Sequence, residues 1–201
     1  MSSDRLKTEE KIKQAALRVF TVKGYDATTT RDIAKEADVN IASLHYYFRS
    51  KDNLFSEVTA ETLTAFNKIL ETVLIGEEPL KFKIYRYVEQ FIGIYQEHPE
   101  LPAFIVMESA RKDSALHQVV SFKDHKLVLE KQLKDLMDKG EIRPISTLDF
   151  ISNLVGLMVF PFLCKNIFER EFQMTDEEFN QMIETRKKTI PEMIINDLYI
   201  T

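Results

Sequence analysis

The stretch from Gly24 to Leu54 holds the residues whose types and spacing best suit one chemical task, the recognition of double-stranded DNA. Two small residues, Ala42 and Ser43, let a helix enter the major groove closely, so that polar and aromatic side chains beside them can reach base edges. Nearby hydroxyl, guanidinium and ammonium groups suit phosphate contacts. The candidate DNA-binding residues are Thr28, Thr30, Arg31, Asn40, Ala42, Ser43, His45, Tyr46, Tyr47 and Lys51.

Two short helices on either side of a tight turn are predicted to position these side chains. Thr29 can cap the first helix, with Asp32 facing its free amides, and Asn40 can cap the second, which ends near Phe48. The intervening turn is about three residues long, which is the spacing of a helix-turn-helix. The amides at the helix starts after Thr29 and Ser50 can also bind phosphate.

Longer helices are expected before and after this pair. Gly24 stops a helix that begins near Thr8, as glycine commonly does just past a helix end. Ser50 caps a fourth helix that reaches about Leu74. The predicted inner faces of the first two helices consist of Ile12, Ala15, Ala16, Val19, Phe20, Ile33, Ala34 and Ala37.

This segment resembles the DNA-binding domain of the TetR/AcrR family of transcriptional regulators over about Leu6 to Phe66. The resemblance implies a DNA-binding domain at residues 6–66, with its helix-turn-helix at about 29–48, and a ligand-binding and dimerisation domain at 67–201. It places Arg31 toward the DNA backbone and Lys51 on a phosphate, whereas His45 departs from the aromatic or aliphatic residue more usual in the family. The matching residues are Ala15, Ala16, Phe20, Gly24, Tyr25, Thr28, Thr29, Ile33, Ala34, Ala37, Val39, Leu44, Tyr46, Tyr47, Phe48, Ser50, Lys51 and Leu54.

The whole chain is predicted to be all-α, with about nine helices, because helical periodicity recurs almost throughout and strand-like alternation is nearly absent. Ser146 caps one later helix, and Thr175 forms a capping box with Glu178 at the start of the last. Pro161 is expected to kink the helix that contains it. The helices expected after Pro79 cover about 80–96, 101–110, 115–139 (closed by Gly140), 146–168 and 175 onward.

Aromatic and methionine residues are dense in the C-terminal two thirds, and core packing explains most of them. The resemblance implies that some line a pocket for a small apolar or aromatic effector, with a few polar anchors. It also implies that the last two long helices build a two-fold, four-helix interface between two copies. The candidate ligand-binding residues are Phe104, Met107, Glu108, Arg111, Phe122, Asn153, Met158 and Phe162, with Asn166 as a further anchor; the candidate interface residues are Leu154, Leu157, Phe162 and Met193.

Composition and charge narrow the class of protein. The chain carries a net charge of −5, but residues 1–60 hold 10 Lys+Arg against 9 Asp+Glu, so the acidity belongs to the rest of the chain and does not oppose local DNA contacts. Cys164 is the single cysteine, which excludes an intrachain disulfide. The longest apolar run, from Leu154 to Cys164, is too short to cross a bilayer, and no signal peptide is recognised. A cytoplasmic protein without membrane contact is therefore expected.

Catalysis and cofactor binding are not expected. His45, His98, His117 and His125 do not combine with Cys or carboxylates at metal-binding spacing, and no glycine-rich phosphate loop occurs. The sequence therefore predicts a homodimeric DNA-binding regulator, a repressor that a small apolar ligand releases from a pseudo-palindromic operator. Two alternatives stay open: a regulator that needs no ligand or that activates, and an all-helical scaffold or enzyme without DNA binding.

Overall fold

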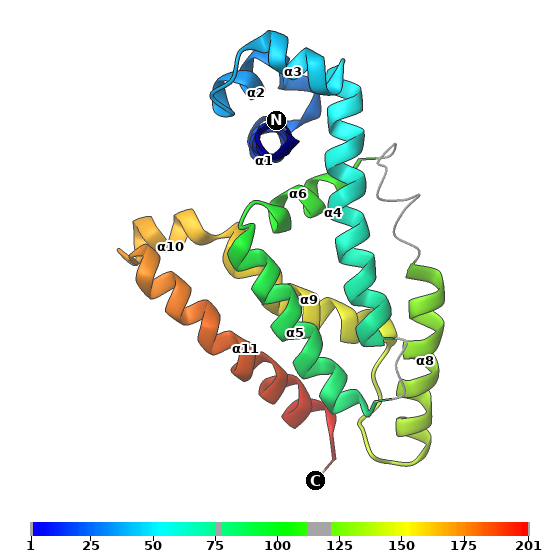
Figure 1. Cartoon of the computed structure of the whole chain (residues 1–201). Coiled ribbons are helices and arrows are strands. Elements are labelled where there is room, and N and C mark those ends of the chain that lie inside the picture. Colours follow the sequence, from blue (N-terminus) through cyan, green and yellow to red (C-terminus); the bar gives the residue numbers. More distant parts are fainter. Residues whose placement is uncertain (1, 75–77, 112–121, 201) are drawn as a thin grey trace. The chain divides into compact units, whose positions relative to one another are not determined.

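The computed structural model describes residues 2–74, 78–111 and 122–200 (Figure 1). These residues form ten helices and no strand, with one isolated antiparallel bridge between Ile142 and Tyr199. Contacts divide them into two compact units: residues 2–65 with 103–111, called unit 1, and residues 66–102 with 122–200, called unit 2. Two helices, α4 (Lys51–Leu74) and α6 (Leu101–Ser109), contribute residues to both units.

Unit 1 is built around α1 (Ser2–Ala27), α2 (Thr30–Glu36) and α3 (Ile41–Phe48). Helix α2 packs against both α1 and α3, which lie beside it in Figure 1. Gly24 interrupts α1 with φ 75° and ψ 163°, a conformation that only glycine adopts readily, so the helix proper ends where the sequence predicted. The predicted inner faces are confirmed, because every side chain assigned to them is buried.

Local capping explains where these helices begin. Thr29 and Asp32 form the predicted capping box of α2, and Asn40 caps α3 by accepting a hydrogen bond from the Ser43 amide at 2.6 Å. Ser50 Oγ accepts a hydrogen bond from the Asn53 amide at 3.1 Å at the start of α4. Each cap joins a side chain to an amide three residues later, and so each follows directly from the local sequence.

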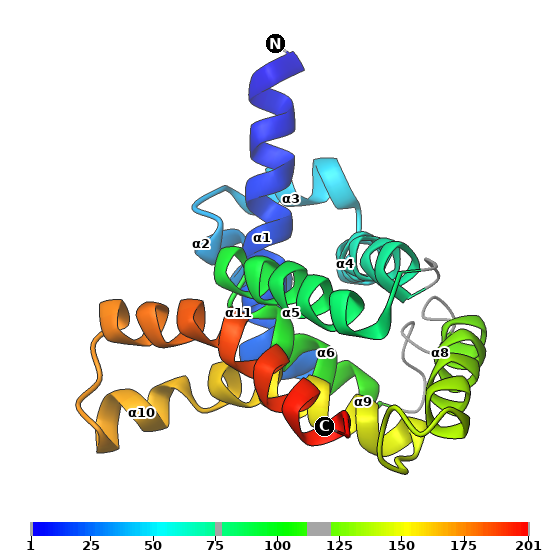
Figure 2. The same cartoon turned by 90° about the horizontal axis from the view of Figure 1, so that it is seen from below.

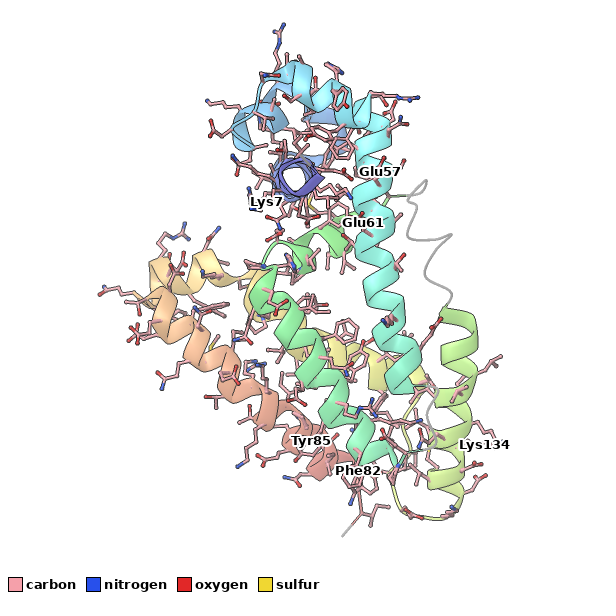
Figure 3. All side chains as sticks on the ribbon, in the orientation of Figure 1. Lys7, Glu57, Glu61, Phe82, Tyr85 and Lys134 are labelled. Carbon is pink, nitrogen blue, oxygen red and sulfur yellow. The ribbon has the colours of Figure 1, made fainter. Side chains whose placement is uncertain are left out.

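Unit 2 contains α5 (Leu80–Glu97), α8 (Phe122–Asp138), α9 (Thr147–Leu163), α10 (Lys165–Glu171) and α11 (Asp176–Leu198). Helix α11 packs along α5 and α9, and α9 also contacts α5, α8 and α10 (Figures 1 and 2). A chain of aromatic rings fills the space between α5, α9 and α11, with centroid distances from 4.4 to 6.0 Å along Tyr87, Phe91, Tyr95, Phe162 and Phe179. On the outer side of α5, Phe82 is 65% exposed (Figure 3).

The predicted helix over 146–168 is wrong in one respect, because it consists of two helices. Helix α9 ends at Leu163, and α10 continues after Cys164 at an angle of 55°. Pro161 lies in the last turn of α9 and cannot donate a backbone hydrogen bond to the Leu157 carbonyl. Arg186 of α11 supplies that hydrogen bond instead, from Nη2 at 2.8 Å. The proline therefore creates an acceptor that the neighbouring helix satisfies.

The first helix begins at Ser2, earlier than the predicted Thr8, and the other predicted helix ends are confirmed where the structure describes them. Gly140 has φ 70° just after α8, and Thr175 forms a capping box with Glu178 at the start of α11. The predicted start of the helix over 115–139 lies outside the described residues, as do Gly76 and His117. No single helix among the described residues is long and apolar enough to span a bilayer, although α9 and α10 pass that test when counted together across their bend.

Candidate nucleic-acid interface

Helix α3 has one buried and one exposed face. Leu44 and Phe48, one turn apart, are buried and hold the helix on unit 1. Ala42 and His45 are exposed, and Tyr46 is 69% exposed, so a row of small, polar and aromatic side chains faces outward. Ser43 and Tyr47 are half-buried at the edges of this row. The arrangement has the form of a recognition helix, because side chains on an outward face can enter a DNA groove.

The N-terminus of α2 is held by a small network around Asp32. The Asp32 carboxylate accepts hydrogen bonds from the Thr29 amide at 3.0 Å and hydroxyl at 2.8 Å, and it pairs with Lys23 Nζ at 2.7 Å. The hydrogen bond from Lys23, which has the largest effect, and those from Thr29 lower the pKa of Asp32 from 3.8 to about 2. Thr30 is half-buried in the first turn, and Arg31 is exposed. Arg31 therefore has the reach that a phosphate contact requires.

Lys51, the first residue of α4, is tied to the segment between α1 and α2. Its Nζ donates hydrogen bonds to the carbonyl oxygens of Tyr25 at 2.9 Å and Thr28 at 3.1 Å, and it lies 4.2 Å from the centroid of the Tyr25 ring. An ammonium group has three N–H donors, so a phosphate would take the third. Lys51 thus fixes the position of this segment, a role that the sequence did not predict.

Thr28 does not face DNA in this structure. The residue is 2% exposed, and its hydroxyl donates a hydrogen bond to the Gly24 carbonyl at 2.7 Å. The predicted phosphate contact from the Thr28 hydroxyl is therefore corrected to an internal hydrogen bond that closes the turn after α1. Asn40 likewise uses its side-chain oxygen to cap α3, which leaves its amide nitrogen as the group able to face DNA.

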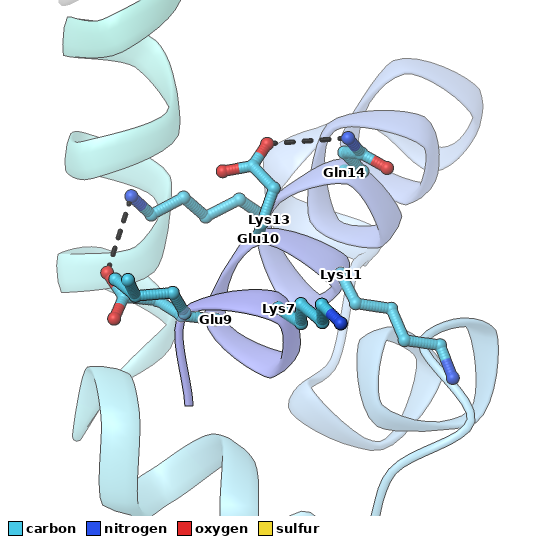
Figure 4. Close-up of a pocket in the computed structure, with 7 residues that line it drawn as sticks. Lys7, Glu9, Glu10, Lys11, Lys13 and Gln14 are labelled. Carbon is cyan, nitrogen blue, oxygen red and sulfur yellow. Dashed lines mark hydrogen bonds and ion pairs between the residues drawn. The ribbon is translucent and has the colours of Figure 1, made fainter. Parts of the chain in front are cut away.

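The outer surface of α1 carries an open groove of about 830 Å³, lined by charged and polar side chains (Figure 4). Within it Lys13 pairs with Glu9 at 3.5 Å and also with Glu61 of α4 at 2.5 Å. Both labelled glutamates of α4 in Figure 3, Glu57 and Glu61, lie in its first half. Because acids and bases alternate here, the groove is a solvated charged face, and we assign no binding role to it.

Three comparisons show which known proteins this chain resembles. Residues 12–58 match the model of the bacterial regulatory proteins of the tetR family. The chain is similar to a protein of Bacillus subtilis named probable HTH-type transcriptional regulator YttP, with 26% identity over 163 residues and 79% of each chain covered. It is also similar to IcaR of Staphylococcus aureus, an HTH-type negative transcriptional regulator of the biofilm operon icaADBC. The identity is 23% over 176 residues, and the match covers 86% of this chain and 91% of IcaR.

Among solved structures, the chain resembles HlyIIR, a hemolysin II transcriptional regulator, with a TM-score of 0.62 and 25% identity over 98% of this chain and 99% of that one. The chain thus matches the tetR family of bacterial regulatory proteins over residues 12–58, and the relatives that it resembles over most of their length are transcriptional regulators. It is a DNA-binding transcriptional regulator with an N-terminal helix-turn-helix and a C-terminal helical part, as the sequence predicted.

The residues predicted to bind a ligand fall into both units. In unit 1, Phe104 and Glu108 are buried and Met107 is 43% exposed, while Arg111 Nη1 donates a hydrogen bond to Glu108 Oε1 at 2.9 Å. In unit 2, Met158 is buried and Phe162 packs edge-on against Tyr95 and Phe179. Asn153 is exposed, and the Phe122 side chain lies outside the described part of the structure. Of these predicted residues, Glu108 and Arg111 are joined directly by their hydrogen bond.

The predicted dimer residues differ in exposure. Leu154 is 4% exposed within the single chain, so its side chain belongs to the core of unit 2 and is not available to a partner; this corrects its prediction as an interface residue. Leu157 and Met193 line a surface groove of about 410 Å³ between α9 and α11, where Met193 is 57% exposed. Phe162 is half-buried among the aromatic rings of unit 2.

Three residues near the DNA-facing segment were missed as site residues. The Tyr25 hydroxyl is hydrogen bonded to Asp52, and the Tyr25 ring packs against Phe55 at 4.6 Å between centroids. Tyr25 was part of the family motif, but its partners lie on α4, beyond α2 and α3 along the chain, and no local pattern pairs them. Among the described residues, no group of three or more His, Cys, Asp or Glu side chains could hold a metal ion.

Proposed function

We propose that this regulator is a homodimeric repressor that binds a pseudo-palindromic operator and that a small apolar or aromatic ligand releases. The observation that carries the DNA-binding part is the outward face of α3, held on unit 1 by the buried side chains of Leu44 and Phe48. Repression is favoured because a relative of similar length, IcaR, is a negative regulator. Action on chromosomal DNA would place the protein in the cytoplasm.

A two-fold dimer is supported by the groove between α9 and α11. Apolar side chains on these helices are exposed in the single chain, among them Met193 on α11 and Phe160 on α9, which are 57% and 58% exposed. Burying them against a second copy would remove apolar surface from water. A dimer would also place two α3 helices on two half-sites of one operator.

The operator is best found by selection from a random DNA pool with the full-length chain. We expect the enriched sequences to share two inverted half-sites, and a reporter placed behind such a sequence to be expressed less when the regulator is present. Enrichment without inverted symmetry would contradict the dimeric reading. Higher reporter expression would show an activator instead.

A thermal-shift screen of small aromatic and aliphatic compounds would then supply ligand candidates. A compound that binds but leaves operator affinity unchanged would argue against release of the operator by a ligand.

The phosphate contacts are tested by salt dependence. Replacing Arg31 or Lys51 with alanine should weaken binding to specific and random DNA alike, and should lower the slope of log affinity against log salt by about one. The Lys51→Ala change should cost more, because it also removes two hydrogen bonds to backbone carbonyls. By contrast, changes at Ser43 or Tyr46 should alter sequence preference more than general affinity. Unchanged slopes would remove Arg31 and Lys51 from the phosphate contacts.

A further inference from the structure

The end of α6 contains an acidic side chain that is almost fully buried. Glu108 is 4% exposed, and Arg111 Nη1 donates a hydrogen bond to its carboxylate at 2.9 Å. A buried carboxylate is costly unless it is paired and hydrogen bonded. Arg111 therefore has a defined place, because its guanidinium must stay beside Glu108 to satisfy that charge.

The same guanidinium lies against two aromatic rings of unit 1. Its central carbon is 5.2 Å from the centroid of Tyr25 and 5.5 Å from the centroid of Phe55. Both distances fall within the range of a cation–π interaction, for which arginine is well suited because its planar group can stack on a ring while its edge pairs with a carboxylate. Phe55 also packs against Phe104 of α6 at 6.3 Å, so the α4 ring that lies against this arginine also contacts α6.

Tyr25 connects this cluster to the DNA-facing segment. Its carbonyl accepts the hydrogen bond from Lys51, its hydroxyl is hydrogen bonded to Asp52, and it directly follows Gly24, where the chain leaves α1. The short segment from Gly24 to Thr29 then leads into the capping box of α2. The position of the Tyr25 ring therefore helps to set where Lys51 and the first turn of α2 lie.

We propose that Arg111 is a positioning residue for DNA binding: held by Glu108, it fixes the Tyr25 ring and thereby the phosphate-facing geometry of Lys51 and Arg31. Arg111 acts through Tyr25 and touches no DNA itself. This inference rests on the proposed phosphate contacts of Lys51 and Arg31. It assigns a DNA-binding role to a residue far along the chain from the helix-turn-helix.

The test compares Arg111→Met with Arg170→Met, a matched loss of one exposed arginine on α10. Affinity for the selected operator is measured by fluorescence anisotropy with full-length protein at several salt concentrations. We expect Arg111→Met to weaken binding about tenfold, equivalent to about 1.4 kcal/mol. The salt slope should stay unchanged, because no phosphate contact is lost, and Arg170→Met should bind like the wild type. Glu108→Gln should weaken binding in the same direction, and Arg111→Lys should fall between.

A second readout follows Tyr25 without DNA. In protein labelled with 3-fluorotyrosine, the ¹⁹F resonance that disappears in Tyr25→Phe should shift in Arg111→Met and stay in place in Arg170→Met. Melting temperatures show whether each variant is folded. If Arg111→Met does not fold, the operator affinities of Arg111→Lys and Glu108→Gln test the inference in its place. Wild-type affinity in the folded Arg111 variants would overturn this inference and leave the proposed function standing. A salt slope lowered by one would make Arg111 a phosphate contact and overturn it too. A wild-type chain that binds no DNA would overturn both this inference and the proposed function.

Discussion

The hydrogen bond from Arg186 to the Leu157 carbonyl allows a quantitative test of how α9 and α11 are joined. Pro161 has no N–H, so it leaves the carbonyl four residues earlier without its helical partner, and Arg186 Nη2 takes that place at 2.8 Å. Replacing Arg186 with methionine keeps much of the side-chain volume but leaves the carbonyl unsatisfied. Replacing Pro161 with alanine restores an N–H that can satisfy the same carbonyl from within α9.

The magnitude follows from the charge of the donor. A hydrogen bond from a charged group contributes about 1.5–3 kcal/mol, and in a chain of this size each kcal/mol shifts Tm by about 2–4 °C. Arg186→Met should therefore lower Tm by roughly 3–12 °C. Burial lowers the pKa of Arg186, which shows that its charge is partly desolvated, so removing it also recovers some free energy. That recovery is common to both backgrounds, and a double-mutant cycle with Pro161→Ala cancels it.

Urea unfolding followed by circular dichroism, at one fixed protein concentration, gives the four free energies of the cycle. We expect Arg186→Met to cost at least about 1 kcal/mol less in the Pro161→Ala background than in the wild type. Lys188→Met on the same helix, whose side chain is exposed, is the matched control and should show no such coupling. An equal loss in both backgrounds would refute the reasoning, because it would mean that the proline does not create the need for Arg186.

Three further outcomes are expected. Gly24→Ala should lower the free energy of unfolding by about 1–3 kcal/mol, because a φ of 75° is strained for alanine even though no neighbour lies within 4 Å of the added Cβ. Gly93→Ala within α5 should instead raise the free energy of unfolding by about 0.5–1 kcal/mol. Urea unfolding measures both changes. The pKa of Asp32 in the folded chain lies below its ordinary value, so its contribution to stability is present above pH 3.8 and is lost as the pH falls toward about 2. In Asp32→Asn, the free energy of unfolding should therefore depend less on pH in this range. A pH dependence identical to that of the wild type would contradict this prediction. Met193→Glu should give monomers in sedimentation velocity, whereas Val22→Glu, equally apolar and 82% exposed, should leave the dimer intact.

The features that the sequence predicts well are local ones. Thr29, Asn40, Ser50 and Thr175 all cap helices in the structure, because a cap needs only a side chain and an amide three residues apart. Gly24 has the backbone conformation that glycine permits, and the apolar faces of α1 and α2 are buried as their periodicity indicates. The outward face of α3 follows from the same periodicity, since its buried residues recur at one helical turn.

The features that the sequence does not predict depend on contacts between distant residues. Thr28 and Lys51 carry groups suited to phosphate, but whether they point outward is decided by the carbonyls of Gly24 and Tyr25 that accept their hydrogen bonds. The sequence predicts a kink at Pro161, but no glycine or side-chain cap marks the residue at which α9 ends and α10 begins. The aromatic and charged residues after position 100 offered many candidate pocket residues, and periodicity cannot tell which of them pack into which unit.

The inclusion of α6 in unit 1 has a physical reason that also bears on function. A domain as small as the first three helices buries limited apolar surface, and small domains are marginal for that reason. Phe104 of α6 is 2% exposed and packs against Phe55, so it extends the core beneath the helix-turn-helix. The stability of the DNA-binding geometry and the position of α6 are thereby coupled. Because such coupling is reciprocal, DNA that held Lys51 and α2 in place, as we propose, would also favour the arrangement in which Arg111 lies against Tyr25.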